Sequence, residues 1–532
     1  MQKKDLLLLL LAIGLLFVGI FDHSLWTPDE PRVAEIARNM AATGDYLIPH
    51  LSGSPFLEQP PLYYAVTGLF WKALGTANEG FGRLSSVLFA LGSLMVVFFG
   101  MRRLYDTGTA VPAVLIASTT IGFFLYSHKM LVDNALAFFI TGAMFSFILA
   151  YLGMLRAGYL FFWICLAGAF LTKGIIGLAI PGVGVAAFAL WQRDFRLITR
   201  AWVVRGTLLV LAVMLAWGYI LYQRGGTDFL FTFFLFNNLG RFMDVGVYQG
   251  GHVRPLYYYL QVIFTEGLPW SLLLIPATVF LRRPDTRLRF FYSWFFGGFI
   301  LLSIASTKRG LYILPLYPAM AAVVGVWLSR MPEDVRPVER RWATWLPGAF
   351  TGLVFIMVPI AFHAKLGGSW QMTLLASLLS ALFLGTMLGS RMFTLPQRLA
   401  ACWALLLLTW SPVLFHQVDV IKSYRPFFRY AGTIVGNERV MGYNLSETAL
   451  AFSSFYGGFR AESIPDWKRF EGMVNAGSTP YVLYFNGRDG SDVQKLLQSR
   501  GFRLIRTTGY DKRPTELWNI KDTSEPQGDK NE

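Results

Sequence analysis

The sequence predicts an all-α polytopic membrane protein with about thirteen transmembrane helices and a small C-terminal α/β domain. The chain of 532 residues is 54% hydrophobic and 15% charged, whereas soluble domains carry about 25% charged residues. Apolar runs near the length of a membrane-spanning helix recur along most of the chain. After about Val418 the pattern changes to short strand-like and helix-like segments.

The apolar runs are the predicted membrane spans. They are Leu6–Phe21, Phe81–Gly100, Ala110–Tyr126, Ala135–Tyr151, Leu160–Leu171, Ile175–Trp191, Thr207–Tyr222, Tyr257–Leu281, Phe290–Ala305, Leu311–Leu328, Ala343–Phe362, Met372–Leu388 and Leu399–Phe415. The short run Leu160–Leu171 fits half a span. The first run follows Lys3 and Lys4 and lacks a small-residue cleavage site after it, so we expect a retained anchor.

Loop charges predict the orientation in the membrane. If the N-terminus is cytoplasmic, every inside loop is basic, as the positive-inside rule requires, and the chain after Val418 lies outside. This arrangement gives a multi-pass membrane protein whose outside loops face away from the cytoplasm. It also explains the net charge of +15 without a nucleic-acid partner. Cys165 and Cys402 lie in apolar runs, so neither a disulfide framework nor a cysteine metal site is indicated.

We therefore expect three regions. A transmembrane domain covers residues 1–417, and its first outside loop covers about 22–80. An outside α/β domain covers residues 418–521, and a disordered polar tail covers 522–532. Within the α/β domain the predicted strands are Val440–Tyr443, Tyr481–Phe485 and Phe502–Ile505, and the predicted helices are Glu447–Phe455 and Asp492–Arg500.

The first outside loop opens with an unusual charged segment. Thr27, Pro28 and Glu30 have the spacing of a capping box with proline at the first helical position, and an amphipathic surface helix follows up to Gly44. Acids in a first helical turn favour the helix dipole, and this explanation is open for Glu30. Asp29 projects along the apolar stripe of the helix beside Arg32. A carboxylate and a guanidinium there indicate a substrate site.

Further polar residues mark the other outside loops. Glu58 is either a solvated loop acid or a ligand, and Tyr63 belongs to an aromatic run suited to the headgroup layer. Asp133 at a helix end is either a cap or a site residue. Lys173 either pairs with phosphate or snorkels. His252 is either a satisfied polar residue or a metal ligand.

The outside cations suit an anionic lipid. They are Arg32, Lys173, Arg241, Lys308 and Arg309. Lys308 and Arg309 precede Tyr312 at an outer boundary, opposite to the usual charge bias, which indicates an anionic ligand such as a lipid phosphate or pyrophosphate. No Walker-type glycine-rich loop is present in the sequence, so a soluble nucleotide donor is not indicated.

Six segments in order resemble the GT-C glycosyltransferases, most of all the branch of aminoarabinose lipid A transferases and other relatives of the protein O-mannosyltransferases. The segments are PDEPRVAEIARNMAATGDYLIP, FLEQPPLYY, LVDNALAFF, LTKG, NNLGRF…GGHVRPLYYY and TKRGLYILPLYP, within about residues 1–330. The family's Glu-Lys pair is Glu58-Gln59 here.

The resemblance implies transfer of a sugar from a polyprenyl-phosphate carrier to a lipid or glycoconjugate acceptor, with lipid A as one candidate, on the periplasmic face. Asp29 is then the expected catalytic carboxylate, with Glu30 and Asp133 as further acids. Contacts to the carrier or substrate are expected from Arg32, Tyr63, Lys173, Arg241, Lys308, Arg309 and Tyr312. Glu58 and His252 match positions implicated in a site for a divalent metal, Zn or Mg.

Two other classes of function stay open from the residues alone. A transporter or flippase for a lipid-linked substrate often shows related halves and charged helices at mid-membrane, whereas here the ionisable groups gather at one face. A non-catalytic assembly protein would use the outer domain to recruit partners. Within the enzyme class, the acceptor is lipid A, another glycan or a protein.

Overall fold

The computed structural model describes residues 2–240, 253–281, 283–330, 337–485, 490–510 and 513–520. The chain divides into two compact units. The helical unit contains Met1–His23, Met40–Pro49 and Pro55–Gln417. The second unit, here called the mixed unit, contains Ser24–Asn39, His50–Ser54 and Val418–Glu532.

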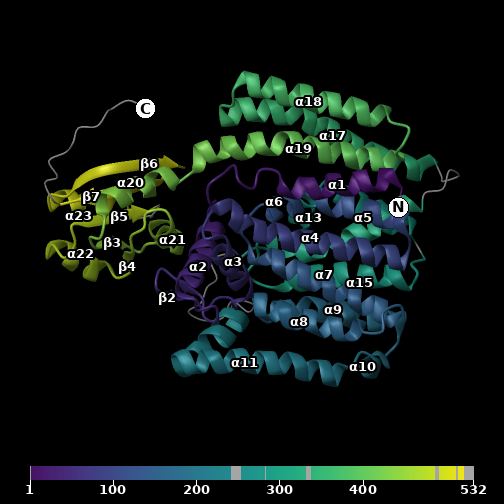
Figure 1. The fold of residues 1–532 in the computed structure, drawn as a ribbon, viewed down its shortest axis with the longest axis horizontal. Coiled ribbons are helices and arrows are strands. Elements are labelled where there is room, and N and C mark those ends of the chain that lie inside the picture. Colours follow the sequence, from purple (N-terminus) through teal and green to yellow (C-terminus); the bar gives the residue numbers. More distant parts are fainter. Residues whose placement is uncertain are drawn as a thin grey trace. The chain divides into compact units, whose positions relative to one another are not determined.

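The helical unit is built from helices alone over most of its described length (Figure 1). They are α1 (Lys3–Phe17), α3 (Leu62–Leu74), α4 (Glu79–Leu104), α5 (Thr107–Thr119), α6 (Ile121–Ser127), α7 (Val132–Tyr151), α8 (Gly158–Lys173), α9 (Ile176–Gln192), α10 (Leu197–Arg200), α11 (Val203–Leu230), the π-helix η1 (Phe231–Gly240), α13 (Tyr258–Glu266), α14 (Ser271–Phe280), α15 (Thr286–Ile304), the 3₁₀ helix η2 (Gly310–Leu316), α16 (Tyr317–Ser329), α17 (Pro337–Leu366), α18 (Trp370–Gly389) and α19 (Leu395–Lys422). Every predicted apolar run falls on one of these helices or on a consecutive pair of them.

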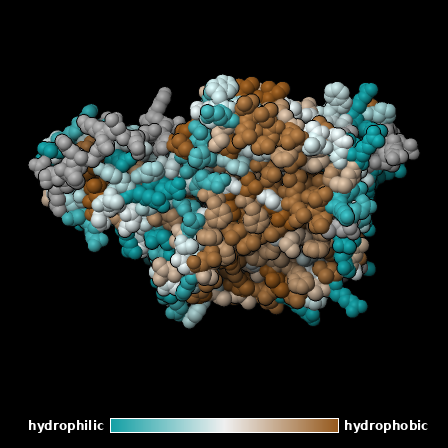
Figure 2. Space-filling view, turned by 45° about the horizontal axis from the view of Figure 1, so that its top comes forward, coloured by the Kyte–Doolittle hydropathy of each residue, from teal (hydrophilic) through white to brown (hydrophobic). Residues whose placement is uncertain are grey.

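The described helices confirm the predicted fold class of a polytopic helical membrane protein. Seven of them are long and apolar enough to cross a membrane, or nine if each of two bent pairs forms one span. The bent pairs are α5 with α6, at 66°, and α13 with α14, at 103°. The apolar helices α8 and α9 are shorter, as expected for the run Leu160–Leu171. Figure 2 shows a broad apolar surface over the helices of this unit, as lipid contact requires.

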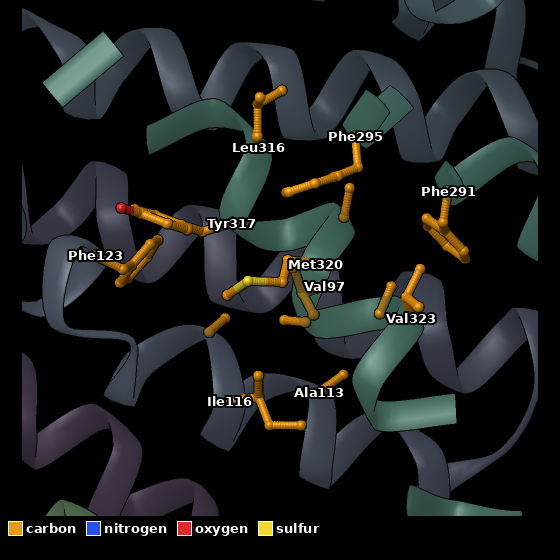
Figure 3. Packing of buried hydrophobic residues seen from close by; sticks show 14 of the residues in the cluster. Val97, Ala113, Ile116, Phe123, Phe291, Phe295, Leu316, Tyr317, Met320 and Val323 are labelled. Carbon is orange, nitrogen blue, oxygen red and sulfur yellow. The ribbon is translucent and has the colours of Figure 1, made fainter. Parts of the chain in front are cut away.

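The core of the helical unit surrounds α16. Figure 3 shows Tyr317, Met320 and Val323 of this helix among side chains from α4, α5 and α15. Gly325 lets the backbone of α16 approach α5, since a Cβ there would lie 3.2 Å from the Cα of Ala113. Small residues allow close helix contact in membranes, where packing replaces the hydrophobic effect as the driving force.

The mixed unit is an α/β structure around a five-stranded sheet with strand order β4-β3-β5-β7-β6. Its elements are α20 (Arg425–Val435), β3 (Val440–Tyr443), α21 (Glu447–Phe455), β4 (Ala461–Ile464), α22 (Trp467–Asn475), β5 (Tyr481–Phe485), α23 (Gly490–Ser499), β6 (Arg503–Tyr510) and β7 (Arg513–Asn519). β3 pairs in parallel with β4 and β5, and β7 pairs antiparallel with β5 and β6.

Both faces of this sheet are covered by helices. Successive side chains of a strand point to opposite faces, so the contacts of two neighbouring residues identify the helices on each face. Tyr484 belongs to a core with side chains of α22 and α23, whereas the next residue, Phe485, contacts Phe428 of α20 and Phe452 of α21. The small α/β part expected after Val418 is therefore present.

The same unit includes two segments from the first loop. The helix α2 (Asp29–Thr43) begins in the mixed unit, and a two-stranded ribbon, β1 (His50–Leu51) with β2 (Ser54–Pro55), turns at Ser52 and Gly53. The predicted amphipathic helix thus forms and ends before Gly44, whose φ of 75° suits glycine.

Candidate active site

The helical unit contains a cavity of about 320 Å³ with one polar and one apolar group of lining residues. The polar lining residues are Glu58, Gln59, Asp133, Lys173, Asn237, Asn238, Thr307 and Tyr312. The apolar ones are Leu136, Ile175, Ile176, Ala179, Ile180, Leu301, Leu302 and Ala305. Four of the residues selected from the sequence, Glu58, Asp133, Lys173 and Tyr312, therefore line one cavity.

The centre of the polar group is a buried ion pair between Lys173 and Asp133. The Nζ of Lys173, at the last residue of α8, donates a hydrogen bond to Oδ1 of Asp133 in the first turn of α7. Their side chains are 11% and 5% exposed. The Lys173 ammonium also lies 4.2 Å from the centre of the Tyr312 ring, a cation–π contact. Lys173 is thus held by groups on two other elements.

Asparagine side chains fix the backbone around this pair. Oδ1 of Asn238 accepts a hydrogen bond from the amide of Ile175 at 3.0 Å, and Nδ2 of Asn237 donates to the carbonyl of Leu57 at 3.0 Å. A Cβ on Gly174 would lie 2.3 Å from Oδ1 of Asn238, and Gly174 has a φ of +70°. Glycine is therefore required where α8 ends.

Lys308 and Arg309, the two adjacent cations of the last outside cluster, directly follow a cavity-lining residue in the sequence. Lys308 and Arg309 follow the lining residue Thr307 and precede η2. The ammonium of Lys308 is buried and donates to the carbonyl of Arg254 at 3.0 Å, and burial lowers the pKa of Lys308. Tyr259 accepts a hydrogen bond from the amide of Arg309 at 3.3 Å. The Lys308 side chain and the Arg309 amide thus tie this loop to Arg254 and Tyr259.

The charged segment of α2 lies in the mixed unit. Arg32 forms an ion pair with Asp29, from Nη2 to Oδ1 at 2.7 Å. Glu30 is fully buried and accepts a hydrogen bond from the amide of Trp26 at 2.8 Å. Because α2 begins at Asp29, Glu30 lies nearer the helix start than the predicted capping box requires, but it still serves the backbone before the helix.

The remaining predicted residues lie elsewhere. Tyr63 is fully buried between helices, and its hydroxyl is hydrogen-bonded to Ser86 at 2.6 Å. Arg241 and His252 fall outside the described residues. Among the described residues, no three His, Cys, Asp or Glu side chains form a group able to hold a metal ion. Glu58 lines the cavity, whereas its predicted partner His252 lies outside the described residues, so the metal site stays a prediction.

Two acids escape sequence reasoning, one in each unit. Glu35 is buried on α2 beside Arg38, in a position that looks solvent-facing by composition. Glu266, at the bend between α13 and α14, accepts a hydrogen bond from Tyr126 at 2.8 Å. The sequence signal for both was weak, because a single acid near an apolar run has no characteristic spacing.

Together the fold and the cavity define a polytopic membrane protein with a cavity that is lined by apolar side chains and a buried ion pair. Residues 6–225 match the family model of dolichyl-phosphate-mannose-protein mannosyltransferases. An uncharacterized protein of Aquifex aeolicus (strain VF5) is 30% identical over 62% of this chain and 74% of its own length.

A named relative matches in sequence, and a solved structure matches in fold. The undecaprenyl phosphate-α-4-amino-4-deoxy-L-arabinose arabinosyl transferase of Pectobacterium carotovorum subsp. carotovorum (strain PC1) is 28% identical over 67% of this chain, and the match spans 64% of that transferase. The crystal structure of ArnT from Cupriavidus metallidurans bound to undecaprenyl phosphate has a TM-score of 0.82 at 20% identity and covers 98% of this chain and 99% of that chain.

The chain belongs to the GT-C glycosyltransferase family that contains the aminoarabinose transferases and their protein O-mannosyltransferase relatives. The family predicted from the six segments is confirmed.

Proposed function

We propose that this protein is an integral membrane glycosyltransferase that moves a sugar from a polyprenyl-phosphate carrier to an acceptor at the periplasmic face of the inner membrane. The observation that carries the proposal is that the buried Lys173–Asp133 pair and branched apolar side chains line one cavity. A polyprenyl phosphate has the same two parts, an anionic head and a branched apolar tail.

The apolar lining supports a lipid donor rather than a soluble one. Ile176 and Ile180 of α9 and Leu302 of α15 offer aliphatic surface for a prenyl chain. Lys173 offers a positive charge for the phosphate, and Tyr312 and Asn238 offer hydrogen-bonding groups. Similarity to a transferase named for undecaprenyl phosphate-linked aminoarabinose supports the same class of donor.

The reaction is a displacement at the anomeric carbon of the donor sugar. The acceptor oxygen forms the new bond to this carbon, and the bond from the carbon to the phosphate oxygen breaks. Polyprenyl phosphate leaves with the bonding electron pair. For a hydroxyl acceptor, the match to the family motif proposes Asp29 as the carboxylate that takes the proton. Lys173 and Lys308 stabilise the charge that grows on the phosphate. General-base help of this kind contributes about 10²–10⁴ in rate.

We propose lipid A as the acceptor, because the six motif segments resemble those of the aminoarabinose lipid A transferases. Residues 1–417 then form the catalytic transmembrane domain, and residues 418–521 form a periplasmic domain. The basic inside loops support this orientation.

The test uses the purified full-length protein in lipid nanodiscs with undecaprenyl phosphate-α-4-amino-4-deoxy-L-arabinose and lipid A. We expect release of undecaprenyl phosphate in a 1:1 ratio with glycosylated lipid A, and loss of both products in Asp29→Asn. Movement of intact donor between leaflets without product would instead support a transporter. Full activity of Asp29→Asn would remove the proposed base.

A further inference from the structure

The first turn of α2 is docked on α21 within the mixed unit (Figure 1). The hydroxyl of Thr448 donates to the carbonyl of Pro28 at 3.2 Å, and the amide of Leu25 donates to the hydroxyl of Tyr456 at 2.8 Å. Ser24 donates from its amide and its hydroxyl to Oδ1 of Asp419, at 2.8 and 2.5 Å. The residues before and at the start of α2 are thus held by the C-terminal part of the chain.

The charged groups of the two helices continue this contact. Arg32 points Nη2 at Oδ1 of Asp29, at 2.7 Å, and Nη1 at Oε2 of Glu447, at 2.6 Å. The side chains of Asp29 and Arg32 are only 14% and 21% exposed. A guanidinium is rigid and planar, so fixing one of its nitrogens also fixes the direction of the other. The position of Arg32 against Asp29 therefore depends on Glu447.

The simpler explanation is that Glu447 is an ordinary first-turn acid of α21 with a surface ion pair. Exposed pairs of this kind contribute little to stability, and the side chain of Glu447 is 43% exposed. That explanation is sufficient for the ion pair between Arg439 and Glu462. In this pair Nη2 lies 2.5 Å from Oε2, and the side chains are 54% and 39% exposed. It does not account for Arg32, which is mostly buried and forms a second ion pair with Asp29, a carboxylate of the family's charged motif.

We infer that Glu447 is a positioning residue, which orients Arg32 so that Arg32 holds the Asp29 carboxylate in one rotamer. This inference rests on the proposed role of Asp29 in sugar transfer. It assigns the C-terminal part of the chain a role in catalysis. It also makes Arg32 a residue that orients Asp29, in addition to any contact with the carrier phosphate.

The inference predicts a specific kinetic signature. Glu447→Gln keeps the size of the side chain but removes the charge that holds Arg32. We expect kcat to fall roughly 10-fold because misorientation of a catalytic group by about 1 Å has effects of this size or larger. The KM for the lipid donor should stay within about twofold, because Glu447 does not line the cavity that is proposed to hold the donor head and tail. Glu447→Asp, which restores the charge on a shorter side chain, should recover part of kcat.

Two comparisons separate positioning from a general structural effect. Glu462→Gln removes a carboxylate of similar exposure from an arginine pair of the same unit, and it should leave kcat and KM unchanged. In an Arg32→Ala background, adding Glu447→Gln should change kcat by less than about twofold, because residues that act through one another are not additive. The melting temperature in detergent identifies any variant that fails to fold.

The inference is overturned if Glu447→Gln has the kcat of the wild type, or if its effect multiplies that of Arg32→Ala. Failure of the proposed function gives a different result, since Asp29→Asn would then be active or the wild type would transfer nothing. Loss of activity in Asp29→Asn together with full activity in Glu447→Gln would reject the positioning role alone.

Discussion

At the scale of single residues, the main feature of the helical unit is the buried ion pair between Asp133 and Lys173. Asp133 and Lys173 lie on different helices and are both largely removed from solvent. A buried pair gains little net stability, but losing one partner leaves an uncompensated charge in the interior. The pair is therefore retained for a purpose that packing alone does not require, and we assign that purpose to the donor phosphate.

This assignment predicts a separation between stability and activity. Lys173→Met should lower the free energy of unfolding by about 3–5 kcal/mol, because Asp133 is left buried without its cation. Adding Asp133→Asn should recover much of the loss, because the unpaired charge is then gone. Transfer activity should stay absent in both variants. Thermal melting in detergent and the transfer assay measure the two quantities, and an active double variant would contradict the assignment.

A second buried acid predicts a pH dependence of stability. Burial raises the pKa of Glu35, although Arg38 lies at 2.8 Å and opposes the shift. The folded state then binds a proton more tightly than the unfolded state, so this group contributes less stability as the pH rises above about 4.5, its ordinary value. Glu35→Gln should flatten the fall in melting temperature as the pH rises above about 4.5. Parallel profiles of variant and wild type would show that Glu35 is not the source.

At the scale of elements, local signals predicted most helices and the exact bounds of a few segments. Val440–Tyr443, Tyr481–Phe485 and Glu447–Phe455 form with the expected bounds, because short apolar runs and helical spacing are local features of the sequence. The strands β4 and β7 were not predicted, because each is extended through its hydrogen bonds to a partner strand and not through a local sequence pattern. The bend between α5 and α6 also depends on neighbouring helices.

The candidate site was less predictable than the helices. Loop motifs selected Asp133, Lys173 and Tyr312, and the structure brings these three together. No pattern indicated that Glu447 pairs with Arg32, because 415 positions separate the two residues in the chain. Nor did any spacing indicate that the Asn237 side chain donates a hydrogen bond to the carbonyl of Leu57. Pairing across such distances is a property of the folded chain.

The turn after α8 gives a test at this scale. Gly174→Ala should lower the melting temperature by an amount equivalent to about 1–3 kcal/mol, because it combines a strained φ with a clash against Asn238. Gly153→Ala is the matched control in the same unit, with a φ of +71° but open space around the added Cβ. Equal effects of the two substitutions would show that the contact with Asn238 carries no weight.

At the scale of the whole molecule, the alternation of basic inside loops with motif-bearing outside loops predicts one orientation. In a variant with Cys165→Ala and Cys402→Ala, a cysteine at Ser478 should react with a membrane-impermeant maleimide in intact spheroplasts. A cysteine at Arg391 should react only after permeabilisation, because its loop is assigned to the cytoplasm. The reverse labelling pattern would place the proposed site on the wrong face.

The central physical claim is that the apolar lining of the cavity binds the polyprenyl carrier. The most direct measurement is photo-crosslinking of the purified protein with a diazirine analogue of undecaprenyl phosphate, followed by peptide mapping. We predict labels at Ile176–Ile180 and Leu301–Ala305, lost with excess undecaprenyl phosphate but not with phosphatidylethanolamine. Labelling spread instead over lipid-facing residues of α18, such as Leu374 and Leu378, and insensitive to competitor, would contradict the account.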